Sequence, residues 1–501
     1  MIPSEVEVAI IGAGTAGMAA YRELRKTTDR IALIEAGPFG TTCARVGCMP
    51  SKLLIAPAEA RHRVKDLPAF GVEVNDVRVD GPAVLKRMRD ERDRFVGFVK
   101  EAVDDFDHAH VIRARATFVS NTELELQPPD IDRPSDAVAD NWVRTSQRLK
   151  AGRIIIATGS HAHVPDAFKS AGDRLITSDD VFYWNDLPDS VAVVGGGVVG
   201  LELGQALHRL GVRVRLFGKD NKLAVLSDPD VLDYALEHMA NALPLTPDLA
   251  DMTLTRDGDA VVIDYETGDG SRHTERFDYL LAATGRRPNL DGLNLEQTGL
   301  ALDDHGVPDH NPRSSQARLA NGENCPIFIC GDVNNELPLL HEAADEGRLA
   351  GENAARFPDV FCRVRRTPLG IVFSDPQIAY AGKRYQELQD EGTEFVVGEA
   401  SFDDQGRARV MLINHGLLRI YGEPGTARIL GAEMIGPAAE HMAHLIAWMI
   451  QADQSVEDVV QMPFYHPTLE EGLRTAFRNL LQALDMGPQP PLHSIDCGPG
   501  G

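Results

Sequence analysis

The first part of the chain alternates short apolar runs with segments of helical pattern. Residues 8–11 (VAII) form a continuous apolar run, and residues 18–25 after them have the pattern of a helix. A second apolar run, at residues 31–34, ends at Glu35. This order of strand, helix and strand predicts an α/β fold with a parallel sheet covered by helices.

The same order recurs at residues 191–194 (VAVV), 201–207 and 212–217. In both copies a GxGxxG turn separates the first run from the helix. Such a turn lets a pyrophosphate approach the helix N-terminus, where backbone N–H groups and the helix dipole favour an anion. We therefore predict two dinucleotide sites, with a flavin and a nicotinamide as the natural pairing. The glycines concerned are Gly12, Gly14 and Gly17, and then Gly195, Gly197 and Gly200.

The two sites differ where a ribose would bind. Glu35, eighteen residues after the first motif, is placed to accept hydrogen bonds from ribose hydroxyls. The same count from the second motif reaches Gly218, followed by Lys219. The second site therefore lacks the carboxylate that favours an unphosphorylated ribose and repels a 2′-phosphate. We expect it to discriminate weakly against NADP(H), although Asp220 could still supply an acid.

An ATG tripeptide closes an apolar strand at two places, residues 157–159 and residues 283–285. The two turns bracket the second nucleotide-binding motif. They are consistent with chain crossings into and out of an inserted domain, and simple turns would explain them equally well.

Length and composition narrow the class of protein. The chain has 501 residues, enough for three or four domains of about 150 residues each. Because its net charge is −25, we expect neither nucleic acid nor an anionic membrane surface as a partner. No secretory signal and no run of about 18 apolar residues is visible. Six cysteines do not form a secreted disulfide framework, so we expect a reducing compartment, the cytoplasm.

Two cysteine pairs share the same spacing. In "CPIFIC", Cys330 ends an apolar run that we predict to be a strand, and Cys325 stands five residues before it. Five residues of strand separate the two Cα atoms by about 17 Å, which is too far for a disulfide. We expect these two thiols to lie in the core. In "TCARVGCMPSK", Cys43 and Cys48 follow a loop, and a regular helix would hold them about 8 Å apart. Gly47 offers the freedom for a distorted turn, so the spacing permits a disulfide without establishing it.

Seven ordered motifs resemble the pyridine nucleotide–disulfide oxidoreductases, and within them the dihydrolipoamide dehydrogenases, over nearly the whole chain. The resemblance implies two Rossmann-like domains for FAD and NAD(P) and an α+β C-terminal dimerisation domain. The motifs are the first GxGxxG with Glu35, TCARVGCMPSK, both ATG turns, the second GxGxxG with Glu202, CGD with Asp332 and LLHEAADEG, FSDPQIA from Phe373, and HPTLEE from His466.

The resemblance also implies roles for the reactive residues. Cys43 and Cys48 resemble the family's redox disulfide, with Cys43 as the thiol that exchanges with substrate and Cys48 as the thiol that faces the flavin. His466 and Glu471 resemble the acid–base dyad. Without the family, Glu471 after Pro467 would indicate helix capping and dipole chemistry, and a histidine would more often be structural.

Further residues resemble the cofactor ligands. Lys52 and Glu202 resemble an ion pair beside the flavin, although each could be an ordinary helix charge. Asp332 resembles the ligand of the ribityl chain, although it could be a turn aspartate after a strand. The remaining positions implied are Thr42, Thr158 and Gly159 for FAD, and Lys219 and Gly285 for NAD(P).

The sequence departs from the family at several positions. Thr41 replaces the second glycine before the first cysteine, Phe464 stands where the dihydrolipoamide enzymes carry a histidine, and Gly218 replaces an acid. A mercuric reductase would end in adjacent cysteines, whereas Cys497 stands alone. The main alternatives to oxidation of dihydrolipoamide are an NADPH-dependent reductase of a small disulfide or other oxidant, and a non-catalytic flavoprotein.

The resemblance predicts the domain order. We expect an FAD domain over residues 1–158, an NAD(P) domain over 159–285, a central return over 286–360, an interface domain over 361–486 and a flexible tail over 487–501. The chain would form a homodimer, with the histidine of one chain serving the cysteines of the other. The residues 441–450, apolar around most of a helix, suit such an interface. A lipoyl-bearing protein is the expected partner.

Overall fold

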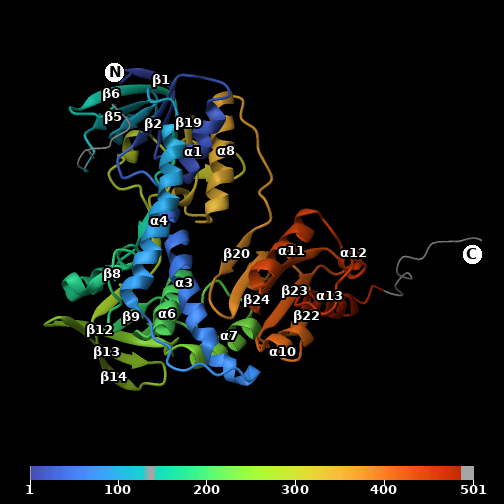
Figure 1. Ribbon diagram of the computed structural model, residues 1–501. Coiled ribbons are helices and arrows are strands. Elements are labelled where there is room, and N and C mark those ends of the chain that lie inside the picture. The colour runs from blue at the N-terminus through green and yellow to red at the C-terminus, as the bar shows by residue number, and fades with distance from the viewer. Residues whose placement is uncertain (1, 130, 132–140, 487–501) are drawn as a thin grey trace, which may run out of the picture.

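The computed structural model describes residues 2–129, 131 and 141–486 (Figure 1). The predicted tail over 487–501, with Cys497, lies outside these residues. Within the described ranges, none of the helices is long and apolar enough to cross a membrane. The described residues form five sheets, and the three largest organise three units: two mainly parallel sheets, which carry the predicted nucleotide-binding motifs, and an antiparallel C-terminal sheet.

The first unit is a sheet of order β17-β18-β19-β6-β1-β2-β3, in which the run from β19 to β3 is parallel. Its apolar strands are buried because helices α1 and α8, which pack against each other, cover one face. The elements are β1 (Glu5–Ile11), α1 (Thr15–Leu24), β2 (Ile31–Glu35), β3 (Val111–Arg113), β4 (Arg115–Ser120), β5 (Glu123–Gln127), β6 (Gln147–Ile156), β17 (His310–Asn311), β18 (Gln316–Arg318), β19 (Asn324–Ile329) and α8 (Leu340–Arg356).

The second unit repeats this design with a parallel sheet of order β11-β10-β9-β15-β8. The two ATG turns lead directly into β7 and β16, which pair with each other, so the two chain crossings lie side by side. The elements are β7 (Ser160–Ala162), β8 (Leu175–Thr177), α5 (Ser178–Val181), β9 (Ser190–Val194), α6 (Val198–Leu210), β10 (Arg213–Phe217), α7 (Pro229–Ala242), β11 (Leu245–Thr246), β12 (Leu249–Asp257), β13 (Ala260–Thr267), β14 (Arg272–Phe277), β15 (Tyr279–Ala282) and β16 (Arg286–Pro288).

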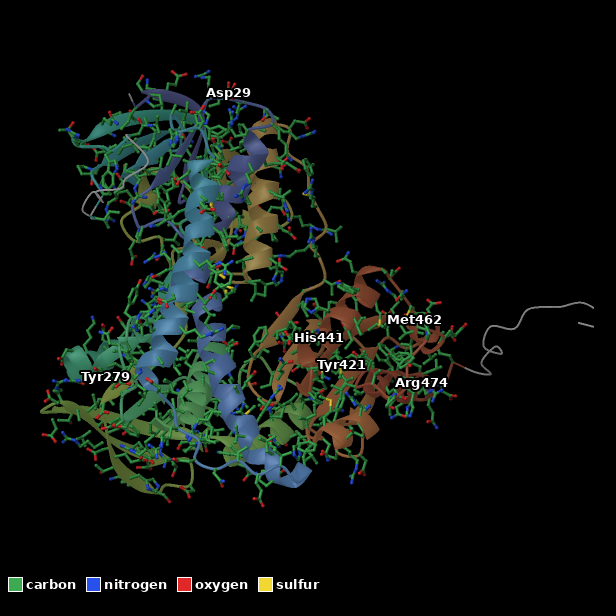
Figure 2. The ribbon with its side chains drawn as sticks, viewed as in Figure 1. Asp29, Tyr279, Tyr421, His441, Met462 and Arg474 are labelled. Carbon is green, nitrogen blue, oxygen red and sulfur yellow. The ribbon has the colours of Figure 1, made fainter. Side chains whose placement is uncertain are left out.

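The C-terminal unit is an antiparallel sheet of order β20-β21-β24-β23-β22 with α11 and α13 packed on it. It lies beside the other two units, and Figure 2 labels Tyr421 and His441 within it and Tyr279 in the second unit. The elements are β20 (Leu369–Val372), β21 (Gln377–Gly382), α9 (Tyr385–Asp390), β22 (Val396–Ser401), α10 (Gly406–Met411), β23 (Leu417–Gly422), β24 (Ile429–Gly436), α11 (Ala439–Gln451), α12 (Val456–Val460) and α13 (Glu471–Leu484).

Helix α11 buries one face in its own chain and exposes the other. Met442 and Ile446 are buried against the sheet, whereas Trp448 keeps 63% of its surface exposed. An exposed tryptophan on an otherwise apolar helix is typical of a surface that a partner covers. The intrachain packing therefore accounts for only part of the apolar pattern at residues 441–450.

Two long helices link the nucleotide-binding units, α3 (Cys48–Arg63) and α4 (Gly81–Asp104). Both run from the first unit toward the second in Figure 1, and α3 packs against α6 of the second unit. The cysteine-bearing helix therefore bridges the two nucleotide-binding units.

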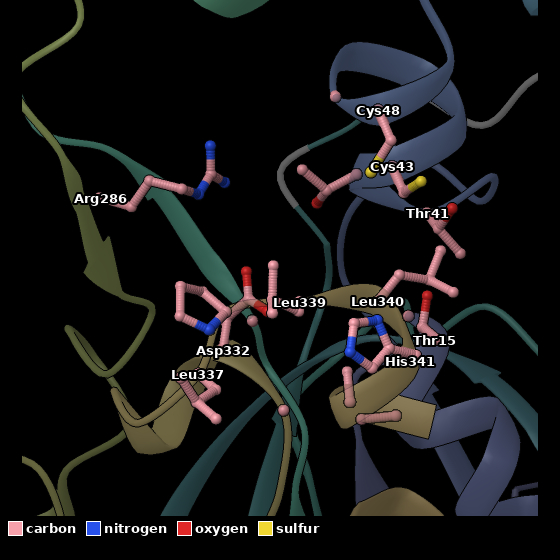
Figure 3. Close-up of a pocket in the computed structure, with 18 of the residues that line it drawn as sticks. Thr15, Thr41, Cys43, Cys48, Arg286, Asp332, Leu337, Leu339, Leu340 and His341 are labelled. Atoms are coloured by element: carbon pink, nitrogen blue, oxygen red, sulfur yellow. The ribbon is translucent and has the colours of Figure 1, made fainter. Parts of the chain in front are cut away.

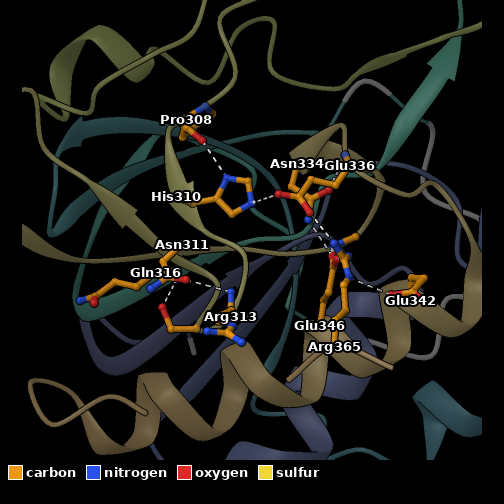
Figure 4. A network of polar contacts seen from close by, with 12 residues as sticks. Pro308, His310, Asn311, Arg313, Gln316, Asn334, Glu336, Glu342, Glu346 and Arg365 are labelled. Atoms are coloured by element: carbon orange, nitrogen blue, oxygen red, sulfur yellow. Dashed lines mark hydrogen bonds and ion pairs between the residues drawn. The ribbon is translucent and has the colours of Figure 1, made fainter. Parts of the chain in front are cut away.

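A strap without helix or strand, residues 357–368, leads from α8 to β20. Arg365 fastens it by ion pairs to Glu336, Glu342 and Glu346, as Figure 4 shows. Glu346 also accepts hydrogen bonds from the Gly331 N–H and the Asn334 side chain, both at 2.7 Å. The strap is thereby tied to the turn that carries the predicted ribityl ligand.

A buried carboxylate joins the second unit to the C-terminal sheet. Glu433, fully buried on β24, accepts hydrogen bonds from the N–H and hydroxyl of Ser227, both at 2.6 Å, and from the N–H groups of Asp228 at 3.1 Å and Tyr385 at 2.8 Å. Four donors compensate for the cost of burying this charge. Glu433 is therefore a main fastening between these two units.

We predict that Glu433→Ala lowers the free energy of unfolding by about 3 kcal/mol or more, because four buried donors lose their acceptor at about 1–3 kcal/mol each. Urea unfolding would measure the loss. The matched control is Glu394→Ala, which removes an exposed carboxylate of the same unit and should change stability by less than about 0.5 kcal/mol. Equal stability of the two variants would contradict the fastening role of Glu433.

Candidate functional site

The first glycine turn has the shape of a dinucleotide cradle. Gly12 has a φ of +106°, and a Cβ there would lie 2.4 Å from the Ala157 carbonyl oxygen. A Cβ on Gly17 would lie 1.9 Å from the Gly12 oxygen, so only glycine lets the turn fold back on α1. Gly14 has open space around it. The turn therefore leaves the N-terminus of α1 accessible to a pyrophosphate.

Glu35 closes the ribose side of this cradle. Its carboxylate accepts hydrogen bonds from the N–H groups of Ala13 and Gly37, both at 2.7 Å. Burial raises the pKa of Glu35, while these two N–H groups lower it. The predicted position at the end of the second strand is confirmed, since Glu35 is the last residue of β2.

The second glycine turn repeats the geometry. Gly195 has a φ of +125°, a Cβ on Gly200 would lie 1.9 Å from the Gly195 oxygen, and Gly197 has open space. At the end of β10, however, Gly218 and the exposed Lys219 stand where the first unit has an acid. The second turn therefore offers the same pyrophosphate cradle without a carboxylate at Gly218.

The cysteine segment folds as two helices broken at Gly47. Helix α2 (Thr42–Val46) ends there, with φ −132° and ψ −118°, and α3 begins at Cys48. A Cβ on Gly47 would lie 3.1 Å from the Cys43 Cα atom, so the break brings the two cysteines together. The distortion for which Gly47 offered the freedom is therefore present.

Thr41 starts this segment in a strained conformation. Its φ of 55° is rare for a residue with a Cβ, which explains why the family prefers glycine at this position. Its hydroxyl accepts a hydrogen bond from the Ala44 N–H at 3.3 Å and caps α2. The cap therefore offsets part of the strain that the substitution introduces.

Cys43 and Cys48 are free thiols that share a hydrogen bond. The bond from Cys43, with the positive charge of Lys52, lowers the pKa of Cys48 to about 7, although burial opposes the shift. The same bond raises the pKa of Cys43. These opposite pKa shifts favour a thiolate on Cys48 over one on Cys43. The disulfide implied by the family resemblance stays a prediction.

Lys52 lies one turn after Cys48 and forms an ion pair with Glu202 of α6. Lys52 Nζ is 2.8 Å from Glu202 Oε2, and Glu202 is only 4% exposed. The other oxygen of Glu202 accepts the Phe373 N–H at 3.0 Å. The buried carboxylate therefore has two donors, and the ion pair holds the ammonium group of Lys52 in place beside Cys48.

Asp332 lies in a short chain of directed hydrogen bonds. The Arg286 Nε–H donates to Ser160 Oγ at 2.8 Å, and the Ser160 hydroxyl donates to Asp332 Oδ2 at 2.7 Å. Because arginine only donates, the hydroxyl proton must go to Asp332. The other oxygen of Asp332 remains available to a ligand hydroxyl. Sequence reasoning missed Ser160 and Arg286, although each directly follows an ATG turn.

These groups share one cavity of about 1640 Å³. Figure 3 shows Cys43 and Cys48 on one side of the cavity and Asp332, Leu337 and Leu339 on the segment opposite them. The Arg286 side chain extends into the space between these two sides. The predicted site residues that line the cavity are Gly12, Gly14, Glu35, Thr42, Cys43, Cys48, Lys52, Thr158, Gly159, Glu202 and Asp332. The predicted residues outside it are Gly17, Gly195, Gly197, Gly200, Lys219, Gly285, His466 and Glu471.

The predicted acid–base dyad is formed but does not reach the cavity of its own chain. His466 Nδ1 lies 3.1 Å from Glu471 Oε2, and the histidine side chain is 80% exposed. The hydrogen bond to His466 lowers the pKa of Glu471. Tyr465, next to the histidine, is 82% exposed. The histidine of the dyad is therefore exposed at the surface of the chain.

The second cysteine pair, Cys325 and Cys330, lies in the core as predicted from the sequence. Cys325 and Cys330 are both fully buried free thiols, at the second residue of β19 and directly after its end. Burial raises the pKa of Cys330 and of Cys325. Protonated, inaccessible thiols of this kind serve packing and not redox chemistry.

A dinucleotide cradle and a thiol pair that line one cavity, together with a second cradle outside it, define a two-nucleotide thiol oxidoreductase. Residues 6–347 match the pyridine nucleotide-disulphide oxidoreductase family, and residues 369–477 match its dimerisation domain. The chain belongs to this family. It is therefore an FAD-dependent disulfide oxidoreductase of the dihydrolipoamide dehydrogenase type that uses NAD(P), and the second match supports a homodimer.

Known relatives agree with this assignment. The chain is 28% identical to the dihydrolipoyl dehydrogenase of Geobacillus stearothermophilus, with 93% of this chain and 94% of the relative covered. It is 28% identical to the mitochondrial dihydrolipoyl dehydrogenase of Mesocricetus auratus, with 94% and 95% covered.

Solved structures share the fold. LpdA from Mycobacterium tuberculosis has a TM-score of 0.77 and 23% identity, with 95% of this chain and 100% of that chain covered. The Cu(II) complex of the HOCl-induced flavoprotein disulfide reductase RclA from Escherichia coli has a TM-score of 0.74 and 21% identity, with 95% and 99% covered. The predicted α/β architecture is confirmed.

We predict that the hydrogen bond from residue 43 sets the pKa of Cys48. In Cys43→Ser, which keeps an O–H donor, Cys48 should titrate near the pKa of about 7 that it has beside Cys43. In Cys43→Ala, which has no donor, the midpoint should rise by about one to two pH units, since a hydrogen bond to a charged group contributes about 1.5–3 kcal/mol. Thiolate ultraviolet absorbance against pH measures both, with Cys43→Ala/Cys48→Ala as the baseline. The same midpoint in both single variants would contradict the prediction.

Proposed function

We propose that the protein oxidises the dihydrolipoyl group of a lipoyl-bearing protein with NAD(P)⁺ through a Cys43–Cys48 disulfide. The observation that supports it best is the pair of free thiols, Cys43 and Cys48, in the cavity that the first glycine cradle also lines. We further propose the domain boundaries 1–158, 159–285, 286–360 and 361–486 and, from the six cysteines, a cytoplasmic location.

The described residues fit an FAD molecule. The turn at Gly12 leaves room for a pyrophosphate at the α1 N-terminus, Glu35 stands at the ribose end, and Asp332 has one carboxylate oxygen available for a ribityl hydroxyl. Bound there, FAD supplies the two-electron acceptor through which the electrons of the dithiol reach the nicotinamide. The second cradle, at Gly195, would hold the NAD(P) pyrophosphate.

The residues of this chain carry out the thiol exchange. A substrate thiol gives its proton to His466 and attacks Cys43 Sγ, which forms a mixed disulfide and releases Cys48 as a thiolate. The second substrate thiol then attacks the substrate sulfur of that bond. The product leaves as a cyclic disulfide, Cys43 takes up a proton, and the two cysteines retain the electron pair. The Lys52 ammonium group stabilises the Cys48 thiolate that results.

A second candidate function rests on the nicotinamide side. Gly218 and Lys219 remove a repulsion and add a positive charge where a 2′-phosphate would bind. These residues favour weak discrimination against NADP(H). They are therefore compatible with the second function, that of an NADPH-dependent reductase of a small disulfide or other oxidant. Steady-state assays with each nicotinamide against dihydrolipoamide, lipoamide and glutathione disulfide would separate the two functions.

We predict that Cys48→Ser abolishes oxidation of dihydrolipoamide but retains FAD, because the thiol transfers electrons and does not hold the fold. Cys43→Ser should behave in the same way. Cys325→Ser is the matched control, since it places a buried hydroxyl in the core and should cost stability but leave turnover per bound FAD unchanged. Turnover is measured with free dihydrolipoamide and NAD⁺. Substantial turnover by Cys48→Ser would refute the proposed redox pair.

We predict that His466 acts on the cysteines of the partner chain, because it is exposed and lies outside the cavity of its own chain. His466→Gln alone should lose about 10²- to 10⁴-fold in turnover. Co-expression of His466→Gln and Cys48→Ser with different affinity tags allows purification of the mixed dimer. Shared sites give it one intact site of two, hence about half of the wild-type activity. An inactive mixed dimer would show that each chain supplies its own histidine.

A further inference from the structure

Phe373 contacts the ion pair beside Cys48 from the C-terminal unit. It directly follows β20, and its ring centroid lies 4.5 Å from Lys52 Nζ. Its backbone N–H donates to Glu202 Oε1 at 3.0 Å, while Lys52 donates to Glu202 Oε2 at 2.8 Å. The ammonium group is thus held between a carboxylate and the face of an aromatic ring.

We propose that Phe373 is a positioning residue that holds the Lys52 ammonium group in place beside Cys48. The face of a phenyl ring attracts a cation, and this attraction increases when water is partly excluded. Lys52 is 32% exposed, so without the ring its flexible side chain could swing toward solvent. The ring and Glu202 together restrict it to one place.

The loop that carries Phe373 is fixed firmly enough for this role. Three residues of α6, on one face of the helix, hold residues 373–375: Glu202 accepts the Phe373 N–H, Gln205 exchanges two hydrogen bonds with the Asp375 backbone at 2.8 and 2.9 Å, and Arg209 pairs with the Asp375 carboxylate at 2.9 Å. The position of the ring is therefore set by α6 and by the sheet of the C-terminal unit.

The consequence concerns the charge on Cys48. The groups that act on its thiol are Cys43 from α2, Lys52 from α3 and Glu202 from α6, of which Cys43 and Lys52 favour the thiolate and Glu202 opposes it. If Lys52 moves away, the attraction is lost and the repulsion by Glu202 remains. Through Phe373, the C-terminal unit thereby influences thiolate formation at Cys48, which is far away in the sequence.

The inference rests on the proposed function only in taking Cys48 as the working thiolate. The test uses holoenzyme with Cys43→Ser, in which Cys48 is the one titrating thiol of the pair, and follows thiolate ultraviolet absorbance against pH. Because this readout needs no turnover, its failure is distinct from a failure to oxidise dihydrolipoamide. Cys43→Ser/Cys48→Ala provides the baseline.

Phe373→Leu should raise the Cys48 midpoint by about half a pH unit or more, because the ring face that attracts Lys52 is gone. Phe373→Tyr, which keeps the ring, should restore the midpoint. Phe373→Met, similar in volume and without a ring, should behave as Phe373→Leu does and serves if the leucine variant does not fold. Lys52→Met should give the largest shift in the same direction.

Two results would overturn the inference. One is an unchanged midpoint in Phe373→Leu and Phe373→Met while Lys52→Met shifts it, which would mean that Lys52 needs no ring to hold its place. The other is an unchanged midpoint in Lys52→Met, which would mean that the ammonium group does not act on Cys48. Equal shifts in Phe373→Tyr and Phe373→Leu would also contradict it, since they would reflect general loosening of the loop.

Discussion

The buried charge of Glu202 is the constraint on which the arrangement of this molecule depends. A carboxylate that is 4% exposed must be paired, because an unpaired one costs several kcal/mol. Its partners come from two other parts of the chain, Lys52 on the cysteine-bearing helix and the Phe373 backbone at the start of the C-terminal unit. Satisfying one side chain therefore fixes the cysteine helix, the second nucleotide-binding unit and the C-terminal unit against one another.

Other buried carboxylates follow the same physical rule. The donors of Glu433 include Ser227 and Asp228 of the second unit, far away in the sequence, whereas the donors of Glu346 come from the nearby residues Gly331, Asn334 and Arg365. Each carboxylate would be costly to bury without these donors. The cavity needs fixed walls, since thiol exchange and electron transfer depend on the positions of a few atoms.

Much of the fold could be predicted because its signals are local. The apolar runs at residues 8–11 and 191–194 became central strands, and the glycine spacing specified two turns of matching geometry. The helices after the two glycine turns begin three residues earlier than predicted, at Thr15 and Val198. The spacing of Cys43 and Cys48 could not decide whether they meet, because the break at Gly47 that brings them together is a tertiary feature.

The side-chain contacts of the site could be predicted only in part. Cys43, Cys48 and Lys52 lie close in the sequence, so a motif reveals them. In the chain of hydrogen bonds from Arg286 through Ser160 to Asp332, the bonded residues are 126 and 172 positions apart, and no periodicity in the sequence marks which polar side chains will meet. The contact of Phe373 with Lys52 is hidden for the same reason, because a phenylalanine after a strand is ordinarily a core residue.

The dyad of His466 and Glu471 reveals a limit that a single chain imposes. Glu471 orients the imidazole at 3.1 Å, yet the ring and the neighbouring Tyr465 are among the exposed side chains of the molecule. Orienting a histidine toward solvent has no use in thiol exchange unless another surface covers it. The match to a dimerisation domain supports a homodimer, and both the dyad and the exposed Trp448 on α11 lie within the matched residues. On our proposal, the physical unit of the chemistry is larger than the unit of folding, because one chain builds the cavity and the thiols while its exposed histidine serves a second chain.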